Sequence, residues 1–481
     1  ATKQNQPKLL QNLDSSIDRV LRELNHVSVL IKCKIENSYT KHQQHLLHKY
    51  GKKIGNSKLR TLEYKNVILK QELKSRSQKL KYHKKLYERK RINNAFRKNP
   101  KKVYRSFKGD NIAITEVPHK DEIEKFWKDI WGSSSQFTAE NAPWMNELKK
   151  GYCKNIAEKE YKITIEILNE AIIKIQPNKS PGRDIITGYW FKKFDFFRPI
   201  LAQLFEETFN GKLDLPSWLT TASTILLPKN DQTHLPKNYR PIALLNIMYK
   251  LYTSCINSFL CNHLCENEII TPEQAGGKQG VWGTTEQLLT NKAIMNDAKT
   301  MRRNLITVWL DYRKAFDSIP HNWLIQAMTL AKVPQKMIEA IRYLTQNWYT
   351  IVSINHQNES ITTSTIKFKR GVFQGDSLSV LLFVICLNPL SFLLLKTMGY
   401  SFGKSRTFHH THNFFIDDLK LYAQTVNSMK KQLDIVTQFS KDICMTFGDE
   451  KCAFIQIQKG QIIENREPII INNLKINSVE N

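Results

Sequence analysis

The sequence predicts a mixed α+β fold, because strand-like and helix-like segments alternate along its second half and helix formers dominate its first hundred residues. With 41% hydrophobic residues among 481, the chain can bury a sizeable core. No internal repeat is visible. The expected order from residue 305 onward is strand 305–311, helices 321–346, strands 350–368, helix 376–396, hairpin 413–423, helix 427–445 and strand 452–457.

The N-terminal part is expected to form long basic helices. Residues 59–96 contain neither Gly nor Pro. Residues 51–110 hold 21 Lys/Arg against four acids, which is more than half of the chain's net charge of +28. A solvated helix would mix both signs of charge, so we predict a nucleic-acid contact, with an anionic membrane surface as the competing partner. The cations expected to contact nucleic acid are Lys81, Lys84, Lys85, Arg89, Lys90, Arg91, Arg97, Lys101, Lys102 and Arg105.

The region between this arm and residue 305 contains shorter elements. An acidic-aromatic helix is expected over 121–131, with a linker over 132–135 behind it. Further expected elements are a helix 164–175, a turn-rich loop 178–184, a helix with Trp190, strands 224–229 and 238–244, and an apolar helix that ends near Leu264.

The apolar run 380–395 and the cysteines indicate how the chain relates to membranes and to a redox compartment. The apolar run 380–395 is shorter than the ~20 residues that a membrane span needs, and Asn388 and Pro389 interrupt it, so we expect a buried helix and no membrane partner. The eight cysteines are scattered, which fits a reducing compartment. Cys261 and Cys265 are predicted to be buried helix thiols one turn apart rather than metal ligands.

Three carboxylates form the candidate catalytic group. Asp417 and Asp418 share a turn between two apolar runs, and Asp311 ends the strand 305–311. Adjacent acids repel each other, and a cation relieves that repulsion. Taken singly, Asp311 could be a helix cap and the Asp pair an ordinary surface turn. Together they are the set with which a polymerase holds two divalent cations, while Asp317 is expected to be a cap or structural residue.

A glycine-rich turn at 370–379 is the second candidate. Gly375 would bring the backbone close to a ligand, and Gln374 offers a neutral amide to a base or sugar. Asp376 is placed to cap the helix that begins near Ser377, and a simple capped helix start is the alternative reading.

In this order the segments resemble motifs A, B, C and D of reverse transcriptases. Motif A is Asp311-Tyr-Arg-Lys-Ala-Phe-Asp317, and motif B is Gly371-Val-Phe-Gln-Gly-Asp-Ser-Leu-Ser379. Motif C is Phe415-Ile-Asp-Asp418, and motif D is Gly448-Asp-Glu-Lys-Cys452. Upstream, Asn178-Lys-Ser-Pro-Gly-Arg-Asp184, Asn238-Tyr-Arg-Pro-Ile-Ala-Leu244 and Glu273-Gln-Ala-Gly276 resemble segments of non-LTR retrotransposon enzymes, so the resemblance covers roughly 170–457. The run Asp417-Asp-Leu-Lys-Leu-Tyr422 is similar to site-specific elements with a restriction-like endonuclease.

The resemblance implies a right-hand polymerase with fingers and a ferredoxin-like palm sheet, a basic helical N-terminal extension and a largely absent thumb. The implied domains are an extension 1–115, a connecting helix and linker 116–160, fingers 161–304, a palm 305–457 and a truncated palm-to-thumb segment 458–481. It also implies an RNA-directed DNA polymerase that works by target-primed synthesis. Its partners would be template RNA, a DNA primer or target DNA, and dNTPs, and its location the nucleus, without a clear targeting signal. A catalytically inactive RNA-binding remnant and an intron maturase are the alternatives.

Individual roles follow from the resemblance. Asp311 and Asp417, assisted by Asp418, would bind two Mg²⁺ ions, with Mn²⁺ as an alternative. Phe316 would exclude a ribose 2′-hydroxyl, and Lys451 would donate a proton to pyrophosphate. Nucleotide contacts are implied for Lys229, Arg240, Phe316, Gln374 and Gly375.

The sequence departs from the family's pattern in three places. Val380 replaces a usual Pro, which could shift the start of the motif B helix, and 276–283 is an unusual version of the segment that follows the finger strands. Beyond Lys451 only a strand-like run 469–476 remains, and no Cys or His follows Cys452. We therefore expect a fragment of a longer polyprotein.

Overall fold

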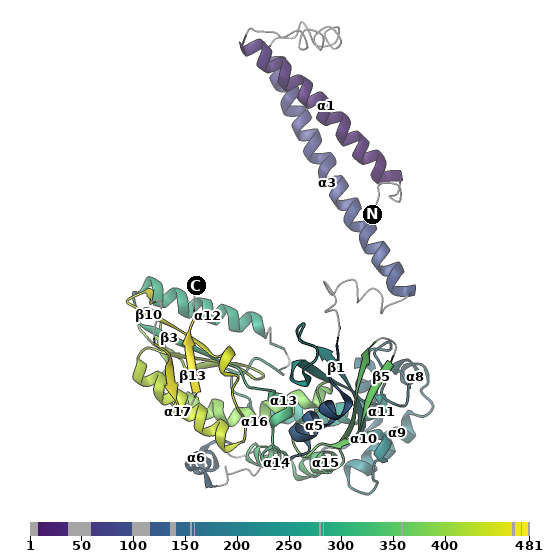
Figure 1. The fold of residues 1–481 in the computed structure, drawn as a ribbon, viewed down its shortest axis with the longest axis vertical. Coiled ribbons are helices and arrows are strands. Elements are labelled where there is room, and N and C mark those ends of the chain that lie inside the picture. The colour runs from purple at the N-terminus through teal and green to yellow at the C-terminus, as the bar shows by residue number, and fades with distance from the viewer. Residues whose placement is uncertain are drawn as a thin grey trace. The chain divides into compact units, whose positions relative to one another are not determined.

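A computed structural model describes residues 8–36, 59–98, 116–134, 141–153, 156–157, 159–278, 280–281, 283–356, 359–463, 467–472 and 474–479. The chain divides into two compact units, Ala1–Ala113 and Ile114–Asn481 (Figure 1). Part of the expected linker, Ser135, lies outside the described residues, as do Lys101, Lys102 and Arg105.

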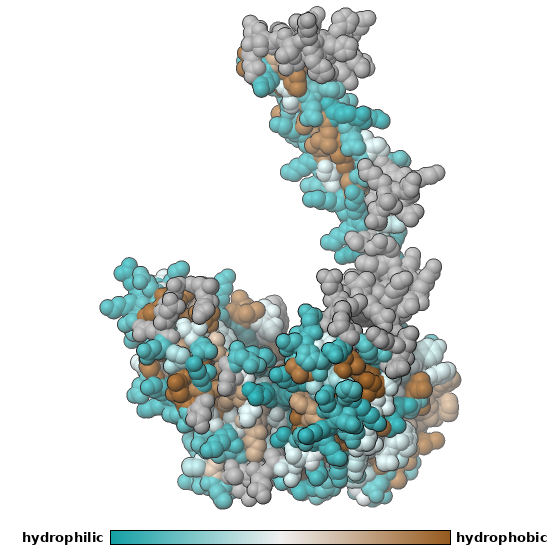
Figure 2. Space-filling view, viewed as in Figure 1, coloured by the Kyte–Doolittle hydropathy of each residue, from teal (hydrophilic) through white to brown (hydrophobic). Residues whose placement is uncertain are grey.

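The first unit is a helical hairpin of α1 (Lys8–Glu36) and α3 (Leu59–Lys98). The helices run antiparallel, since Asn66 bonds to Ser28 while Lys84 pairs with Asp14. Val20, Val27 and Leu69 are buried between them. The long basic helix expected over 59–96 is thus confirmed, and hydrophilic side chains cover most of its visible face in Figure 2.

The second unit begins with a series of helices. These are α5 (Lys120–Trp131), α6 (Pro143–Gly151), α7 (Ile165–Lys174), α8 (Gly188–Lys193), α9 (Arg198–Phe209) and α10 (Ser217–Thr220). The helices predicted over 121–131 and 164–175 are confirmed. Helix α5 buries three residues on one face, Ile123, Trp127 and Trp131, at the i, i+4, i+8 spacing of an amphipathic helix.

A four-stranded sheet has the order β2-β1-β4-β5. Its strands are β1 (Thr221–Pro228), β2 (Tyr239–Leu244), β4 (Tyr349–His356) and β5 (Glu359–Lys367). β1 pairs antiparallel with β2 and parallel with β4. The expected boundary at residue 305 therefore does not coincide with the division between sheets, because β4 and β5 join the strands that were assigned to the fingers.

The other large sheet is seven-stranded, with the order β12-β13-β10-β3-β9-β8 and β11 paired to β10. Its strands are β3 (Leu305–Leu310), β8 (His412–Phe415), β9 (Asp418–Ala423), β10 (Ala453–Gln458), β11 (Gln461–Ile463), β12 (Ile469–Ile471) and β13 (Leu474–Ser478). The run 469–476 is thus two short strands rather than one. A small separate ribbon joins β6 (Tyr400–Phe402) and β7 (Phe408–His410).

Helices cover both faces of this sheet. They include α12 (Thr284–Thr300) on one side and α17 (Val426–Asp442) on the other (Figure 1). Leu305 and Tyr422 pack with Ile294 of α12, while the alternate positions Val308 and Leu421 belong to the main core. This alternation is the two-residue period of a β-strand.

The centre of the second unit is occupied by long apolar helices. Its remaining helices are α11 (Ile247–Glu266), α13 (Ala315–Ser318), α14 (His321–Leu330), α15 (Gln335–Gln346) and α16 (Ser377–Leu395). Helix α16 is apolar and long enough to cross a membrane, but 83% of it is buried inside the protein, which confirms the predicted core helix. The helical placement of Cys261 and Cys265 is confirmed, with their Sγ atoms 3.9 Å apart, and Cys261 is buried in α11. The predicted burial is wrong for Cys265, which is exposed near the end of the helix.

Asp376 caps α16, as predicted, and gives the fold a pH dependence. Its carboxylate accepts hydrogen bonds from Leu378 N (3.4 Å) and Thr253 Oγ1 (3.0 Å). Burial raises the pKa of Asp376 to about 6.

A raised folded-state pKa means that Asp376 stabilises the fold below the unfolded pKa and that this contribution is lost as the pH rises towards 6. We expect Asp376→Asn, which keeps a capping side chain, to reduce the fall in the free energy of unfolding between pH 4 and 7 by about 2 kcal/mol. Urea titrations of both proteins across this range measure the difference. Equal pH slopes would contradict the prediction.

Candidate active site

The two sheet strands β3 and β9 bring the three predicted carboxylates to one edge. β3 pairs antiparallel with β9, and Leu310 lies opposite Leu419. Asp311 directly follows β3, while Asp418 begins β9 and Asp417 stands in the turn before it. The sheet register thus places the end of one strand beside the start of the other.

The turn that carries Asp417 is strained and clamped. Ile416 has φ 59°, a left-handed conformation that is unfavourable for a β-branched residue. Gln274 holds it at both ends: Ile416 N donates to Gln274 Oε1 (2.9 Å), and Gln274 Nε2 donates to Ile416 O (3.2 Å). A side chain at Gly276 would approach Ile416 N to 2.5 Å, so only glycine fits beside the clamp. Gln274 is a supporting residue to which the sequence reasoning gave no role.

The charges at this edge are coupled. Burial, and after it the neighbouring Asp418 and Asp311, raise the pKa of Asp417 to about 6. The pKa of Asp418 is also raised, first by burial and then by Asp311. Lys451 Nζ lies 2.9 Å from Asp311 Oδ2 and balances part of this negative charge.

These oxygen donors fit a hard divalent cation. Mg²⁺ is held in proteins by one or two carboxylates together with substrate phosphates, and carboxylates that repel each other gain stability when a cation binds. Over the described residues, however, no three His, Cys, Asp or Glu side chains are placed to hold a metal ion together. Asp311 and Asp417 are half-buried at this edge of the sheet, whereas Asp418 is exposed.

One cavity of about 390 Å³ collects the predicted residues. Its wall includes the following predicted side chains: Asp311, Asp417, Lys451, Lys229, Arg240, Phe316, Gln374 and Gly375. Asp418 is the predicted site residue of this unit that does not line it. The residues come from the end of β1, from β2, the end of β3, α13, the loop before α16, the turn before β9 and the turn before β10. Lys229 and Lys451, more than 200 positions apart in the sequence, thus line the same cavity.

The structure shows that basic side chains gather at the cavity and why position 375 must be a glycine. Burial, together with Lys451 and Arg240, lowers the pKa of Lys229, which shows that positive groups gather here. Gly375 has φ 131°, and a Cβ there would lie 2.6 Å from Ala243 O. The loop crosses β2 at this point, where Ala243 N donates to Gln374 O (2.8 Å). Only glycine allows that close approach.

Comparison with protein families identifies the family to which the residues of this cavity belong. The model of the family described as "Reverse transcriptase (RNA-dependent DNA polymerase)" matches residues 227–467, which is half of the chain and contains the carboxylates, the cations and Gln374. The chain belongs to the reverse transcriptase family.

Relatives of this reverse transcriptase come from transposable elements. The "Transposon TX1 uncharacterized 149 kDa protein" of Xenopus laevis is 29% identical over 275 residues, which are 56% of this chain and 20% of that protein. A "Retrovirus-related Pol polyprotein from type-1 retrotransposable element R2" of Nasonia vitripennis is 25% identical, covering 53% of this chain and 24% of the relative. The corresponding R2 polyprotein of Bradysia coprophila is 22% identical over 75% of this chain and 40% of its own length. The chain thus spans about a fifth to two fifths of the relatives it matches.

The departures from the family pattern leave the reverse transcriptase site in place. Val380 lines the cavity, and α16 nevertheless begins at Ser377 behind the Asp376 cap. Phe316, half-buried, stacks on Phe383 of α16 with ring centroids 4.7 Å apart. The helix start expected from sequence is confirmed despite the missing Pro.

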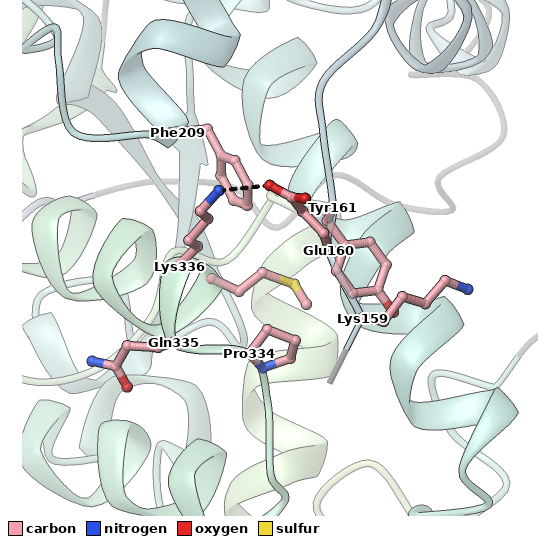
Figure 3. A pocket seen from close by; sticks show the side chains of 8 residues that line it. Lys159, Glu160, Tyr161, Phe209, Pro334, Gln335 and Lys336 are labelled. Carbon is pink, nitrogen blue, oxygen red and sulfur yellow. Dashed lines mark hydrogen bonds and ion pairs between the residues drawn. The ribbon is translucent and has the colours of Figure 1, made fainter. Parts of the chain in front are cut away.

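A second hollow, of about 290 Å³, lies away from these residues (Figure 3). Phe209, Pro334 and Met337 contribute its apolar wall, and Lys336 pairs with Glu160 across it (3.1 Å). It contains none of the predicted catalytic or nucleotide-binding residues, so it is not a candidate for the polymerase site.

Proposed function

We propose that this reverse transcriptase is the RNA-directed DNA polymerase of a non-LTR retrotransposon. The supporting observation is the single cavity that gathers Asp311 and Asp417 with Lys229, Arg240 and Phe316. Acids that can hold divalent cations, next to basic side chains that can meet a triphosphate, are the combination that nucleotidyl transfer requires. The R2 names of the relatives support the element type.

Each side chain has a task in this proposal. Asp311 and Asp417 hold Mg²⁺, which when bound lowers the pKa of the primer 3′-hydroxyl and stabilises the charge on the phosphates. Lys229 and Arg240 neutralise the triphosphate. Lys451, an ammonium already beside Asp311, gives a proton to the leaving pyrophosphate.

The proposal extends to architecture and partners. The sheet of β1, β2, β4 and β5 serves as fingers, and the seven-stranded sheet serves as the palm. Template RNA, a nicked target DNA as primer and dNTPs are the substrates, and target-primed synthesis places the protein in the nucleus. Nucleic acid of either kind would meet the exposed cations of α3.

A primer-extension assay tests the activity. The protein, a DNA primer annealed to an RNA template, dNTPs and Mg²⁺ are expected to give at least single-nucleotide addition that EDTA abolishes. The same primer without template is the control for untemplated addition. A protein that binds the duplex but adds no nucleotide with Mg²⁺ or Mn²⁺ would refute the proposal.

Phe316 gives a prediction about sugar selection. Its ring is fixed against Phe383 and lines the cavity, so it can clash with a ribose 2′-hydroxyl. We expect Phe316→Ala to raise the ratio of rNTP to dNTP incorporation by about a hundredfold, because most discrimination against a 2′-hydroxyl would rest on this contact. Single-turnover incorporation of matched rNTP and dNTP pairs measures the ratio.

The control for this prediction is Phe383→Leu, which loosens the stacking partner but leaves the Phe316 ring in place. It is expected to change selectivity less than Phe316→Ala does. An unchanged ratio in Phe316→Ala would show that another group excludes the ribose.

A further inference from the structure

Helix α5 reaches the wall of the polymerase cavity although it precedes the family-matched segment 227–467. Trp131, the last residue of α5, donates a hydrogen bond from Nε1 to Asp317 Oδ1 (3.0 Å). The other oxygen of Asp317 accepts from Gln374 Nε2 (3.1 Å). A three-residue chain thus connects α5 to a side chain that lines the cavity.

The indole of Trp131 is held firmly. It is 1% exposed and stacks between Trp127 and Phe368, with ring centroids 4.5 and 4.6 Å away. Lys369 N donates to Trp131 O (2.7 Å), and Arg370 Nε donates to Ile130 O (2.5 Å). The end of α5 is therefore fixed to the segment that leads from β5 into the motif B loop.

The carboxylate of Asp317 decides how Gln374 is turned. Asp317 is 2% exposed, and both of its carboxylate oxygens accept a hydrogen bond, one from Trp131 Nε1 and one from Gln374 Nε2. An ionised carboxylate can only accept hydrogen bonds, so Gln374 must turn its NH₂ group to Asp317. The amide oxygen of Gln374 then faces away from Asp317, and the cavity receives a hydrogen-bond acceptor at this position.

A second contact ties α5 to the same wall. Lys314 Nζ lies 4.0 Å from the ring centroid of Trp127 and 4.4 Å from that of Phe126. Lys314 lines the cavity and has a left-handed backbone (φ 49°). Lys314 thus packs on the ring faces of Phe126 and Trp127, a contact that any aromatic ring at position 127 would keep.

We infer that Trp131 and Asp317 are positioning residues that fix the amide of Gln374, and that α5 thereby completes the nucleotide-binding site. This inference rests on the proposed polymerase function. It assigns to the segment before the family match a part in dNTP binding, through a contact between residues 186 positions apart.

Trp131→Phe is the direct test, because phenylalanine keeps a stacking ring but lacks the N–H donor. Trp127→Phe is the matched control on the same helix: Trp127 is fully buried, and its Nε1 has no hydrogen-bond partner among the described residues. We expect Trp131→Phe to lower kcat/KM for dNTPs about tenfold, mainly through KM, while Trp127→Phe changes it less than threefold. Equal effects of the two substitutions would overturn the inference.

A double-mutant cycle shows whether Trp131 acts through Gln374. In a Gln374→Met background, Trp131→Phe is expected to have no further effect on kcat/KM, because the amide it positions is gone. The same tenfold loss in both backgrounds would mean that Trp131 acts by another route. If Trp131→Phe does not fold, Asp317→Asn replaces it in the cycle: its NH₂ group would face the Gln374 NH₂ group and turn that amide around.

Equilibrium dNTP affinity separates this inference from the proposed function. A primer ended with a dideoxynucleotide forms a complex that binds dNTP without reacting. If the wild-type protein adds no nucleotide in the primer-extension assay, the polymerase proposal fails. The positioning role is then decided by this affinity alone: a tenfold loss in Trp131→Phe, but not in Trp127→Phe, supports it, and equal affinities refute it.

Discussion

Asp417→Asn is expected to lower the rate of nucleotide addition by about a thousandfold, because it removes a negative oxygen donor from the metal-binding edge. Asparagine keeps the volume of aspartate and can still accept a hydrogen bond, so the clamped turn can persist. The carboxylate of Asp417 is destabilised by burial and by Asp418 and Asp311, which raise its pKa to about 6. The neutral amide removes that repulsion, so the thermal stability of the metal-free protein should stay equal or rise.

A loss of activity together with an equal or higher thermal stability would distinguish a lost metal ligand from a damaged fold. A substitution that merely damaged the fold would lower activity and stability together. Single-turnover primer extension at saturating Mg²⁺ gives the rate, a thermal melt in EDTA gives the stability, and primer–template affinity should stay within about threefold. Asp418→Asn is the matched control: the neighbouring acid is exposed and does not line the cavity, and we expect a smaller loss, of about tenfold to a hundredfold. Activity of Asp417→Asn within tenfold of wild type would contradict the metal assignment.

The sequence predicted the members of the cavity because their signals are local. Asp311 ends a strand, Gly375 follows Gln374 in a turn, and Asp417 stands between two apolar runs. Each of these patterns lies within about ten residues of sequence. The order of the motifs along the chain then indicated that the residues belong to one site. The structure confirmed the elements on which these residues stand, including the β3 strand, the β8–β9 hairpin and the cap of α16.

What the sequence could not predict depends on contacts between distant segments. The clamp of Gln274 on the Ile416 turn crosses 142 residues, and the Trp131–Asp317 bond crosses 186. Periodicity marked Trp131 only as part of an aromatic helix and Asp317 only as a cap or structural residue. The parallel pairing of β1 with β4 likewise placed 349–367 in the sheet of β1 and β2, which no local pattern indicates.

The two adjacent acids of the three-carboxylate group, Asp417 and Asp418, occupy different positions relative to the cavity. The resemblance implied that Asp417 is a metal ligand and that Asp418 assists it, and successive residues at the start of a strand point in different directions. Asp417 therefore lines the cavity and Asp418 does not. A sequence gives the identity of such a pair, while the register of the hairpin decides which member faces the site.

The second large effect concerns α3, which carries 14 Lys/Arg and three Glu in 40 residues. Lys81, Lys85 and Arg89 are spaced four residues apart and so share one helical face, and Lys84 and Lys90 flank them. All five side chains are exposed, as is Tyr82 at 65%, and Lys84 Nζ lies 3.6 Å from Asp14 Oδ1. The side chains of Arg91 and Arg97 lie outside what the structure describes, so they are left unchanged in this test.

Replacing these five cations by Gln is expected to weaken RNA binding at 0.15 M salt by about a hundredfold to a thousandfold. It should also reduce the slope of log K against log salt by about 4, since each phosphate contact contributes ~0.7 to 0.9. Fluorescence anisotropy with a labelled single-stranded RNA at several salt concentrations gives both quantities.

A matched variant separates a local binding face from net charge. Replacing five dispersed exposed lysines of the second unit, Lys149, Lys150, Lys212, Lys299 and Lys475, removes the same formal charge. If α3 is a binding face, this variant changes the slope by less than 1, because dispersed charges act on RNA only at long range, where salt screens them. Equal losses in the two variants would mean that the helix contributes charge but no site. At saturating RNA the α3 variant should still extend a primer at the wild-type rate, since Asp311 and Asp417 belong to the other compact unit.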